Sequence, residues 1–142
     1  MPTMLILDDV RGELMYDPEE KIVHHHYGKT LDSEHLKALM LRGNGLLKQY
    51  GAEKWLSDNR DLVEHSAEDN DWLTKIWTPG AISAGWKYWA LIVPEQIRGR
   101  MNMFEFVNLF YEKGIRVMVF VDYDPAWQWL KDVDKKADQD RK

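Results

Sequence analysis

The chain has 142 residues, of which 44% are hydrophobic and 30% are charged, and its formal net charge is −5. These values are typical of one folded domain, and the acidic balance argues against a nucleic-acid partner because no global positive field attracts phosphates. The chain contains no cysteine, which excludes disulfide bonds, thiolate nucleophiles and zinc sites built from cysteine.

The N-terminal residues predict three short strands. Residues 4–7 form an apolar run, and residues 13–16 and 21–28 flank the segment Asp-Pro-Glu-Glu at 17–20. A proline at the second position of such a segment is typical of a β-turn. We therefore expect the second and third strands to pair antiparallel.

A long helix is expected next. Residues 30–33 offer capping side chains, and apolar residues recur at helical spacing over 36–50. Gly43 lies on the apolar stripe, where it either lets the helix approach a sheet closely or introduces a kink. Gly51 is a plausible C-terminal stop.

The middle of the chain alternates strand, helix and strand. Residues 52–59 read as a short strand, and Ser66 with Asp69 has the spacing of a capping box at the start of a helix. Residues 78–80, Thr-Pro-Gly, are expected to end that helix. The nearly continuous apolar run at 86–93 is typical of a strand buried on both faces.

The last third predicts helix, strand and helix. A third helix is expected over 101–113, and residues 115–122 form another buried strand. The last helix begins with Asp124 as N-cap and Pro125 at its first position. Residues 134–142 are charged and almost free of apolar side chains, which predicts a disordered tail.

Strands that alternate with helices favour right-handed crossovers and a parallel sheet. The predicted fold is α/β, with a single mixed, mainly parallel sheet, an N-terminal antiparallel hairpin and about four helices. Residues 1–133 are expected to form the one domain. No stretch approaches the roughly 18 apolar residues of a membrane helix, so we expect no membrane insertion. The absence of cysteine suits a reducing cytoplasm, which is the expected location.

Three consecutive histidines, His24 to His26, raise the question of a metal site. Side chains alternate across a strand, so His24 and His26 share one face and His25 lies on the other. Three adjacent strand residues cannot converge on one ion, and neither His35 nor His65 completes a recognised spacing. We interpret the run as a half-exposed edge strand and expect no metal.

The segment after the 52–59 strand is the strongest candidate for recognition. Ligands of open parallel sheets collect at the carboxyl ends of strands, where Ser57, Asp58, Asn59 and Arg60 are expected. Ser66 would lie at the N-terminus of the next helix, which favours phosphate. The segment is either a partner-binding loop with a modifiable serine or an ordinary strand-to-helix loop.

No catalytic set is apparent in the sequence. His65, Ser66 and Asp69 are too close in sequence to form a triad readily, and no nucleophile elbow or phosphate-binding glycine loop is present. We therefore expect neither enzymatic activity nor a cofactor. Seven tryptophans include Trp127 and Trp129, which cannot both face the core on helical counting. Trp129 is a candidate for an aromatic interface, and a homodimer is possible.

Several segments resemble a bacterial family related to anti-sigma-factor antagonists, the STAS/SEC14-like or SpoIIAA-like domains. The similarity covers roughly residues 14–131 and depends on a Trp-rich helix before Pro-Gly, on AGWKYWALIVPE, on an Asn-Met-x-x-Phe helix and on GIRVMVFVDYDPAWQWL. It implies helices mainly on one face of the sheet and a non-enzymatic regulatory role. In antagonists, a serine in an Asp-Ser-Ser-Gly-like motif is phosphorylated; this chain lacks that motif and has only Ser57 and Ser66 in the comparable place.

Two functions therefore stay open. The first is a regulatory module that binds a protein partner through the segment after the 52–59 strand and exposed aromatic side chains. The second is a small-molecule or lipid-binding domain, with an apolar pocket lined by Trp72, Trp77 and Phe106. An aromatic cavity above about 300 Å³ would favour the second function, and a closed core with a flat aromatic patch would favour the first.

Overall fold

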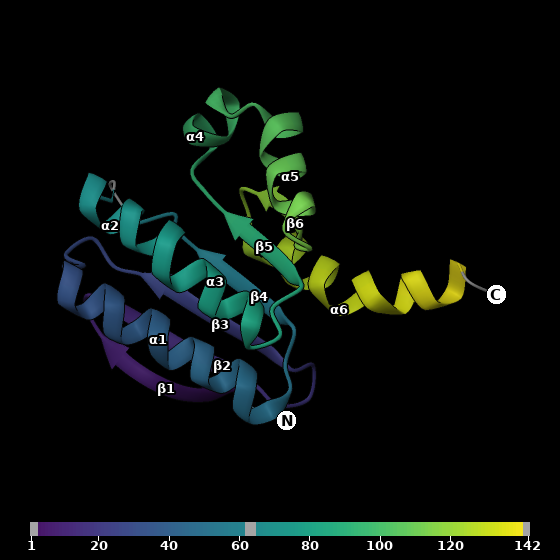
Figure 1. Cartoon of the computed structure of the whole chain (residues 1–142), viewed down its shortest axis with the longest axis horizontal. Coiled ribbons are helices and arrows are strands. Elements are labelled where there is room, and N and C mark those ends of the chain that lie inside the picture. The colour runs from purple at the N-terminus through teal and green to yellow at the C-terminus, as the bar shows by residue number, and fades with distance from the viewer. Residues whose placement is uncertain (1–2, 62–64, 141–142) are drawn as a thin grey trace.

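The computed structural model describes residues 3–61 and 65–140, which fold around one six-stranded mixed sheet (Figure 1). The strands lie in the sheet in chain order. They are β1 (Met4–Asp9), β2 (Gly12–Asp17), β3 (Ile22–Tyr27), β4 (Lys54–Asp58), β5 (Tyr88–Ile92) and β6 (Arg116–Phe120). The predicted α/β class is confirmed.

The sheet changes from antiparallel to parallel at β3. β1, β2 and β3 pair antiparallel, and β3, β4, β5 and β6 pair parallel. The turn at 17–20 joins β2 to β3, as the sequence predicts. Its Asp17 carboxylate accepts hydrogen bonds from the backbone N–H groups of Glu19 and Glu20 at 2.9 and 3.1 Å. These bonds fix the register of the hairpin.

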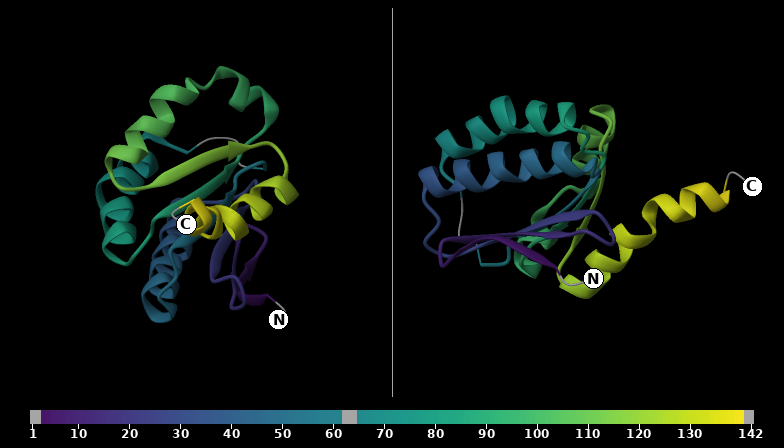
Figure 2. Two further views of the ribbon diagram at one scale, coloured as in Figure 1. Left: turned by 90° about the vertical axis from the view of Figure 1, so that its right-hand side faces the viewer. Right: turned by 90° about the horizontal axis from the view of Figure 1, so that it is seen from below.

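The helices connect the parallel strands. They are α1 (Ser33–Tyr50), α2 (Ala67–Trp72), the π-helical turn η1 (Leu73–Trp77), α3 (Thr78–Ser83), α4 (Glu95–Arg100), α5 (Met103–Glu112) and α6 (Tyr123–Asp140). Successive right-handed crossovers that move in one direction leave their helices on one face of the sheet. The helices between the strands accordingly cover one face, and α6 returns across the other (Figures 1 and 2).

Each face of the sheet has its own core. Val23, Trp55 and Trp86 belong to the cluster beneath α1 and α3, whereas Ile22 and Leu56 pack against α6. This division follows from the alternation of side chains along each strand. Adjacent residues of β3 and β4 therefore belong to different cores, which decides where the residues of the candidate site point.

α1 lies very close to the sheet at Gly43. A Cβ atom at this position would lie 2.0 Å from Cη2 of Trp55, so any larger residue would collide with a buried indole. The close-approach role of Gly43 is thus confirmed, in a helix that is continuous from Ser33 to Tyr50. Asp32 caps this helix through the backbone N–H of His35, and Gly51 ends it with φ at +62°.

The prediction that residues 78–80 end the second helix is wrong. α2, η1 and α3 follow one another without a break to Ser83. Proline lacks an N–H group, and in a regular α-helix its ring clashes with the carbonyl four residues earlier. The π-helical turn immediately before Pro79 shifts the hydrogen-bonding pattern: the N–H of Thr78 donates to the carbonyl of Leu73, five residues back.

Two further helical segments differ from expectation. α4, a short helix between β5 and α5, is additional to the predicted set. α6 begins at Tyr123 and continues to Asp140, through most of the segment expected to be a disordered tail. Its first half packs on the sheet, and its second half extends beyond it (Figure 2). Lysine, alanine and glutamine at 135–139 are good helix formers and allow a packed helix to propagate.

Candidate functional site

A pocket of about 250 Å³ lies on the face of the sheet covered by the crossover helices. Its walls come from η1 and its flanking helices on one side and from α5 on the other, and its floor comes from β3, β4 and β5. The described residues that line it are His25, Tyr27, Met40, Ser57, Asn59, His65, Asn70, Leu73, Thr74, Trp77, Thr78, Trp89, Leu91, Phe106 and Phe110. None of these lining residues is aspartate, glutamate, lysine or arginine.

Aromatic rings line the α5 side of the pocket and the adjoining part of β5. Trp89 packs edge-on against Phe110 at 4.9 Å between ring centroids, and Phe106 lies 5.1 Å from Phe110. Behind them, Trp77 contacts both Trp55 and Trp86 at 5.2 and 5.1 Å. Ring pairs at these distances and tilts attract one another beyond their simple burial. The pocket therefore has a firm aromatic wall.

His25 forms the polar centre of the floor. The side chain is fully buried, and its Nδ1 atom lies 2.9 Å from Nε1 of Trp55. An indole nitrogen can only donate, so Nδ1 of His25 accepts and the proton of the neutral ring is on Nε2. That Nε2–H group donates to Oδ1 of Asn59 at 3.0 Å. Burial lowers the pKa of His25 to about 3, so the ring is neutral at physiological pH.

Ser57 lies next to His25 on the floor. Its Oγ atom accepts a hydrogen bond from the indole N–H of Trp89 at 2.8 Å. The residue is 4% exposed and belongs to β4, so it is not the exposed loop residue that the sequence suggests. A modifying enzyme would reach this hydroxyl only after local opening of the pocket.

Two further side chains make the pocket polar at one end without adding charge. The hydroxyl of Tyr27 donates to the sulfur of Met40 at 3.0 Å, and burial raises the pKa of Tyr27. His65 packs edge-on against Tyr27 at 5.3 Å between centroids. Burial lowers the pKa of His65, which favours its neutral form.

The π-helical turn shapes the wall opposite α5. Leu73 and Trp77 are the first and last residues of η1, and both line the pocket. The hydroxyl groups of Thr74 and Thr78, also in the wall, donate to backbone carbonyls of Asn70 and Leu73 at 2.9 and 2.8 Å. Single π turns within α-helices are frequent at functional sites.

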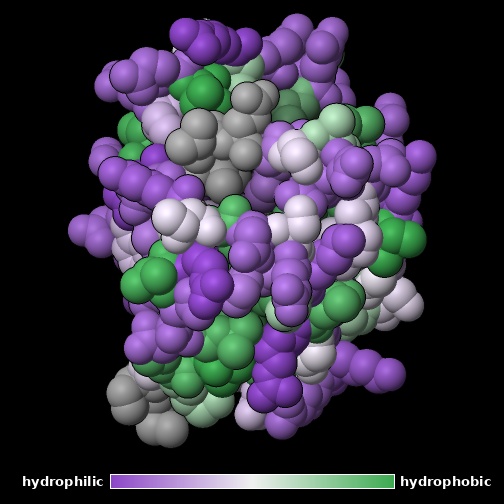
Figure 3. All heavy atoms as spheres, turned by 90° about the vertical axis from the view of Figure 1, so that its left-hand side faces the viewer, coloured by the Kyte–Doolittle hydropathy of each residue, from purple (hydrophilic) through white to green (hydrophobic). Residues whose placement is uncertain are grey.

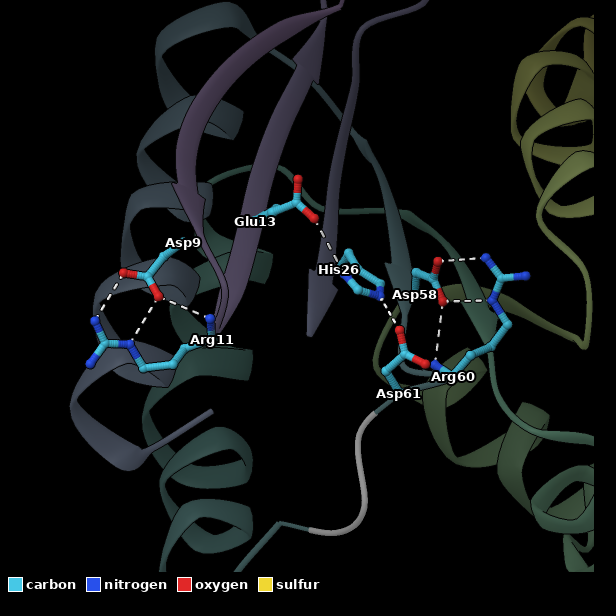
Figure 4. Close-up of polar contacts among 7 residues, drawn as sticks. All are labelled: Asp9, Arg11, Glu13, His26, Asp58, Arg60 and Asp61. Atoms are coloured by element: carbon cyan, nitrogen blue, oxygen red, sulfur yellow. Dashed lines mark hydrogen bonds and ion pairs between the residues drawn. The ribbon is translucent and has the colours of Figure 1, made fainter. Parts of the chain in front are cut away.

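The structure separates the residues of the predicted recognition loop. Ser57 and Asn59 face the pocket, whereas Asp58 and Arg60 pair with each other on the opposite side (Figure 4). The Arg60 guanidinium contacts both carboxylate oxygens of Asp58, at 2.9 and 2.7 Å. Burial opposes ionisation of Asp58, but the hydrogen bonds from Arg60 outweigh it and lower the pKa of the carboxyl group.

Ser66 and Trp129 lie away from the pocket. Ser66 caps α2, and its hydroxyl accepts from the backbone N–H of Asp69 at 3.1 Å. Trp129 is half-buried beside Phe120, and Trp127 is half-buried against His24. Both rings pack against the core under α6, so the expectation that they cannot both face the core is wrong. An interface at Trp129 stays a prediction.

The histidine run lies in the third of six strands, so its interpretation as an edge strand is wrong. The predicted alternation is confirmed: His25 packs on Trp55, and His24 packs on Trp127 on the other face. His26 lies between Glu13 and Asp61 (Figure 4). Its Nδ1 atom is 3.4 Å from Oε1 of Glu13, and its Nε2 atom is 2.7 Å from Oδ2 of Asp61. In residues 3–61 and 65–140, no three histidine or carboxylate side chains are placed to hold a metal ion.

Figure 3 shows the side of the molecule toward which the parallel strands point. Hydrophilic side chains dominate this surface, and apolar side chains form separate areas between them.

Over the described part of the chain, no helix is long and apolar enough to cross a membrane.

The alternation of side chains along β4 is a sequence signal for this site. In Trp55-Leu56-Ser57-Asp58-Asn59, strict alternation places the first, third and fifth residues on one face. That pattern separates Ser57 and Asn59 from Asp58 and Arg60. The participation of His25 required the knowledge that β3 pairs directly with β4, which the sequence does not specify.

Comparison of the chain with protein-family models, curated proteins and solved structures found no match. The similarity to STAS/SEC14-like domains thus stays a prediction based on sequence segments.

Proposed function

We propose that this chain binds a small, neutral, mainly aromatic molecule in the pocket between β3–β5, η1 and α5. One observation carries the proposal: a recess of about 250 Å³ combines aromatic walls with a floor of neutral hydrogen-bonding groups. Ligand pockets are typically apolar with a few convergent polar groups. Trp77 and Phe106, two of the three residues expected from the sequence, line this recess.

The volume limits the ligand to a small molecule. At about 250 Å³, the pocket is smaller than the roughly 300 Å³ expected of a ligand cavity, so its aromatic and polar lining rather than its size supports the proposal. A compound of one or two rings suits that space, whereas a diacyl lipid is far too large for it. The described lining residues include no aspartate, glutamate, lysine or arginine, which further favours a neutral compound because a buried charge without a partner is costly.

Two tryptophan substitutions on η1 test the proposal. Leu73→Trp fills the pocket, whereas Ile76→Trp adds the same ring at an exposed position one turn away. Saturation-transfer NMR with a panel of neutral one- and two-ring fragments should detect binding with a Kd on the order of 1 mM. We expect binding to be lost in Leu73→Trp and kept in Ile76→Trp. Equal binding by both variants, or no binding by the wild type, would refute it.

A second candidate function is association with a protein partner. Phe104 and Tyr111 are 78% and 69% exposed and lie seven residues apart on α5, which places them on the same side of that helix. Large exposed aromatic side chains on one surface favour a protein contact. A second copy of the chain is the partner that is simplest to test.

Light scattering tests this association at micromolar concentration. A dimer that becomes monomeric when Phe104 and Tyr111 are both changed to Ser would support it. A wild-type protein that is monomeric up to the highest soluble concentration would exclude a homodimer on this surface.

A further inference from the structure

The floor of the pocket presents two neighbouring side chains of one strand. The backbone N–H of Asn59 donates to the carbonyl of Ile92 at 2.9 Å, so the ladder between β4 and β5 continues one residue past Asp58. Ser57 and Asn59 are therefore two residues apart along an extended strand and point to the same side. Both line the pocket.

The orientation of the Asn59 amide is fixed by a chain of hydrogen bonds. The Trp55 indole donates to Nδ1 of His25 at 2.9 Å, which leaves Nε2 as the only protonated nitrogen of the neutral ring. Nε2 then donates to the amide oxygen of Asn59 at 3.0 Å. A flipped amide would set two donors against each other. Asn59 must consequently present its NH₂ group as the free end, and that nitrogen has no partner within residues 3–61 and 65–140.

Ser57 is constrained in the same way. A hydroxyl group has one proton to donate and two lone pairs with which to accept. The Trp89 indole N–H occupies one lone pair at 2.8 Å. No described residue accepts the hydroxyl proton, although the side chain is almost fully buried. The indole N–H groups of Trp55 and Trp89 can only donate. Trp89 acts directly on Ser57 and Trp55 acts on Asn59 through His25, so both leave the floor with free donors.

We infer that Ser57 and Asn59 form a paired donor site that recognises a hydrogen-bond acceptor, such as a carbonyl oxygen, on the molecule bound in the pocket. The inference rests on the proposed function, because it specifies the chemistry of the ligand of that same pocket. Ser57 is buried and Asn59 is half-buried at the pocket, so a ligand that supplies an acceptor to both donors gains hydrogen bonds that an apolar ligand of the same shape does not.

The acceptor belongs to a neutral ligand. Among the described residues that line the pocket, none is aspartate, glutamate, lysine or arginine, and Arg60 on this strand segment is held by Asp58 on the opposite side. A carboxylate would lose its hydration without gaining a counter-charge. A ketone, amide or ester on an aromatic body satisfies both the walls and the floor.

Two probes of nearly identical shape test the inference. Acetophenone carries a carbonyl oxygen where α-methylstyrene carries a CH₂ group, and both are neutral and nearly equal in size. We expect wild-type protein to bind acetophenone about 3- to 10-fold more tightly, which is the usual net value of one hydrogen bond. Dissociation constants are measured by ligand-observed NMR titration.

Two variants assign that preference to the floor. Asn59→Asp keeps the oxygen that accepts from His25 but replaces the NH₂ donor with an acceptor. Ser57→Ala removes the hydroxyl proton. Each variant should reduce the preference for acetophenone, because one of the two donors is lost, with little effect on binding of α-methylstyrene.

The possible results separate the two proposals. Equal affinity of the wild type for both probes overturns the donor pair and leaves the pocket as a binding site. A preference for acetophenone that survives both substitutions also overturns it. Failure of the wild type to bind either probe contradicts the proposed function as well.

Discussion

At the scale of single residues, the environment of His25 and its neighbours is set by burial rather than by charge. His25 is 1% exposed, and His24 is buried on the opposite face against Trp127. Neither ring has a carboxylate within hydrogen-bonding distance among the described residues. Burial lowers the pKa of His25 to about 3 and that of His24 to about 4, because a buried imidazolium loses its hydration.

This environment predicts a loss of stability in mild acid. The unfolded chain takes up protons near the ordinary histidine pKa of about 6.5, whereas the folded state resists protonation until about pH 4. Stability is therefore complete above about pH 6.5 and falls as the pH decreases toward about 4. Each buried histidine contributes a slope of up to about 1.4 kcal/mol per pH unit.

The substitution His24→Phe isolates one of these contributions. Nε2 of His24 has no hydrogen-bond partner among the described residues, so phenylalanine removes the titrating group without breaking a bond. Urea unfolding between pH 7 and pH 5 should give a shallower pH dependence for the variant than for the wild type. Identical slopes would show that His24 is not protonated on unfolding in this range.

At the scale of elements, the contact between α1 and β4 sets the distance between this helix and the sheet in the core beneath α1 and α3. Gly43 lies directly over the Trp55 indole, and this indole donates the hydrogen bond that determines the tautomer of His25. The helix position thus connects the core to the floor of the pocket. A displacement of α1 would be transmitted through Trp55 to His25 and Asn59.

Two glycines of α1 give opposite predictions. Gly43→Ala places a methyl group against the Trp55 ring and should destabilise the fold by about 1–3 kcal/mol, as overpacking usually does. Gly45 has open space around its Cα, so Gly45→Ala should stabilise the helix by about 0.5–1 kcal/mol. Urea unfolding measures both. Equal effects of the two substitutions would contradict the close contact at Gly43.

The elements differ in how far the sequence specifies them. The apolar runs at 86–93 and 115–122 are enough to predict β5 and β6. Gly51 is enough to predict the end of α1, because glycine commonly follows the last residue of a helix. The sequence does not indicate that the second helix continues beyond residue 80. Pro79 breaks only a regular α-helix, and the π turn before it leaves no local sequence signal. The donor pair depends on the pairing of β3 with β4, which is a long-range property.

At the scale of the whole molecule, α6 forms the second layer of the fold. Ala126 and Leu130 pack against Ile22, Leu56 and Ala90 on the face of the sheet opposite the pocket. The buried ammonium group of Lys54 contacts the carboxylate of Asp134 at 2.8 Å, which anchors α6 further along. α6 therefore supports the floor of the pocket from behind.

Leu130 provides a test of this support. The side chain is fully buried, so Leu130→Ala should destabilise the protein by about 2–5 kcal/mol. Gln128→Ala, at an exposed position of the same helix, should change the free energy of unfolding by less than about 0.5 kcal/mol. Thermal or urea unfolding compares the two variants. A small effect of Leu130→Ala would mean that α6 is not part of the folded core.

The most direct test of the pocket uses the indole N–H signals of the tryptophans. Trp77 and Trp89 line the pocket, whereas Trp127 and Trp129 lie on the other side of the sheet. In ¹H–¹⁵N correlation spectra, titration with the strongest-binding neutral fragment should shift the signals of Trp77 and Trp89 and leave those of Trp127 and Trp129 unchanged. Shifts confined to Trp127 and Trp129, or no indole shift at saturation, would contradict a ligand site beneath the crossover helices.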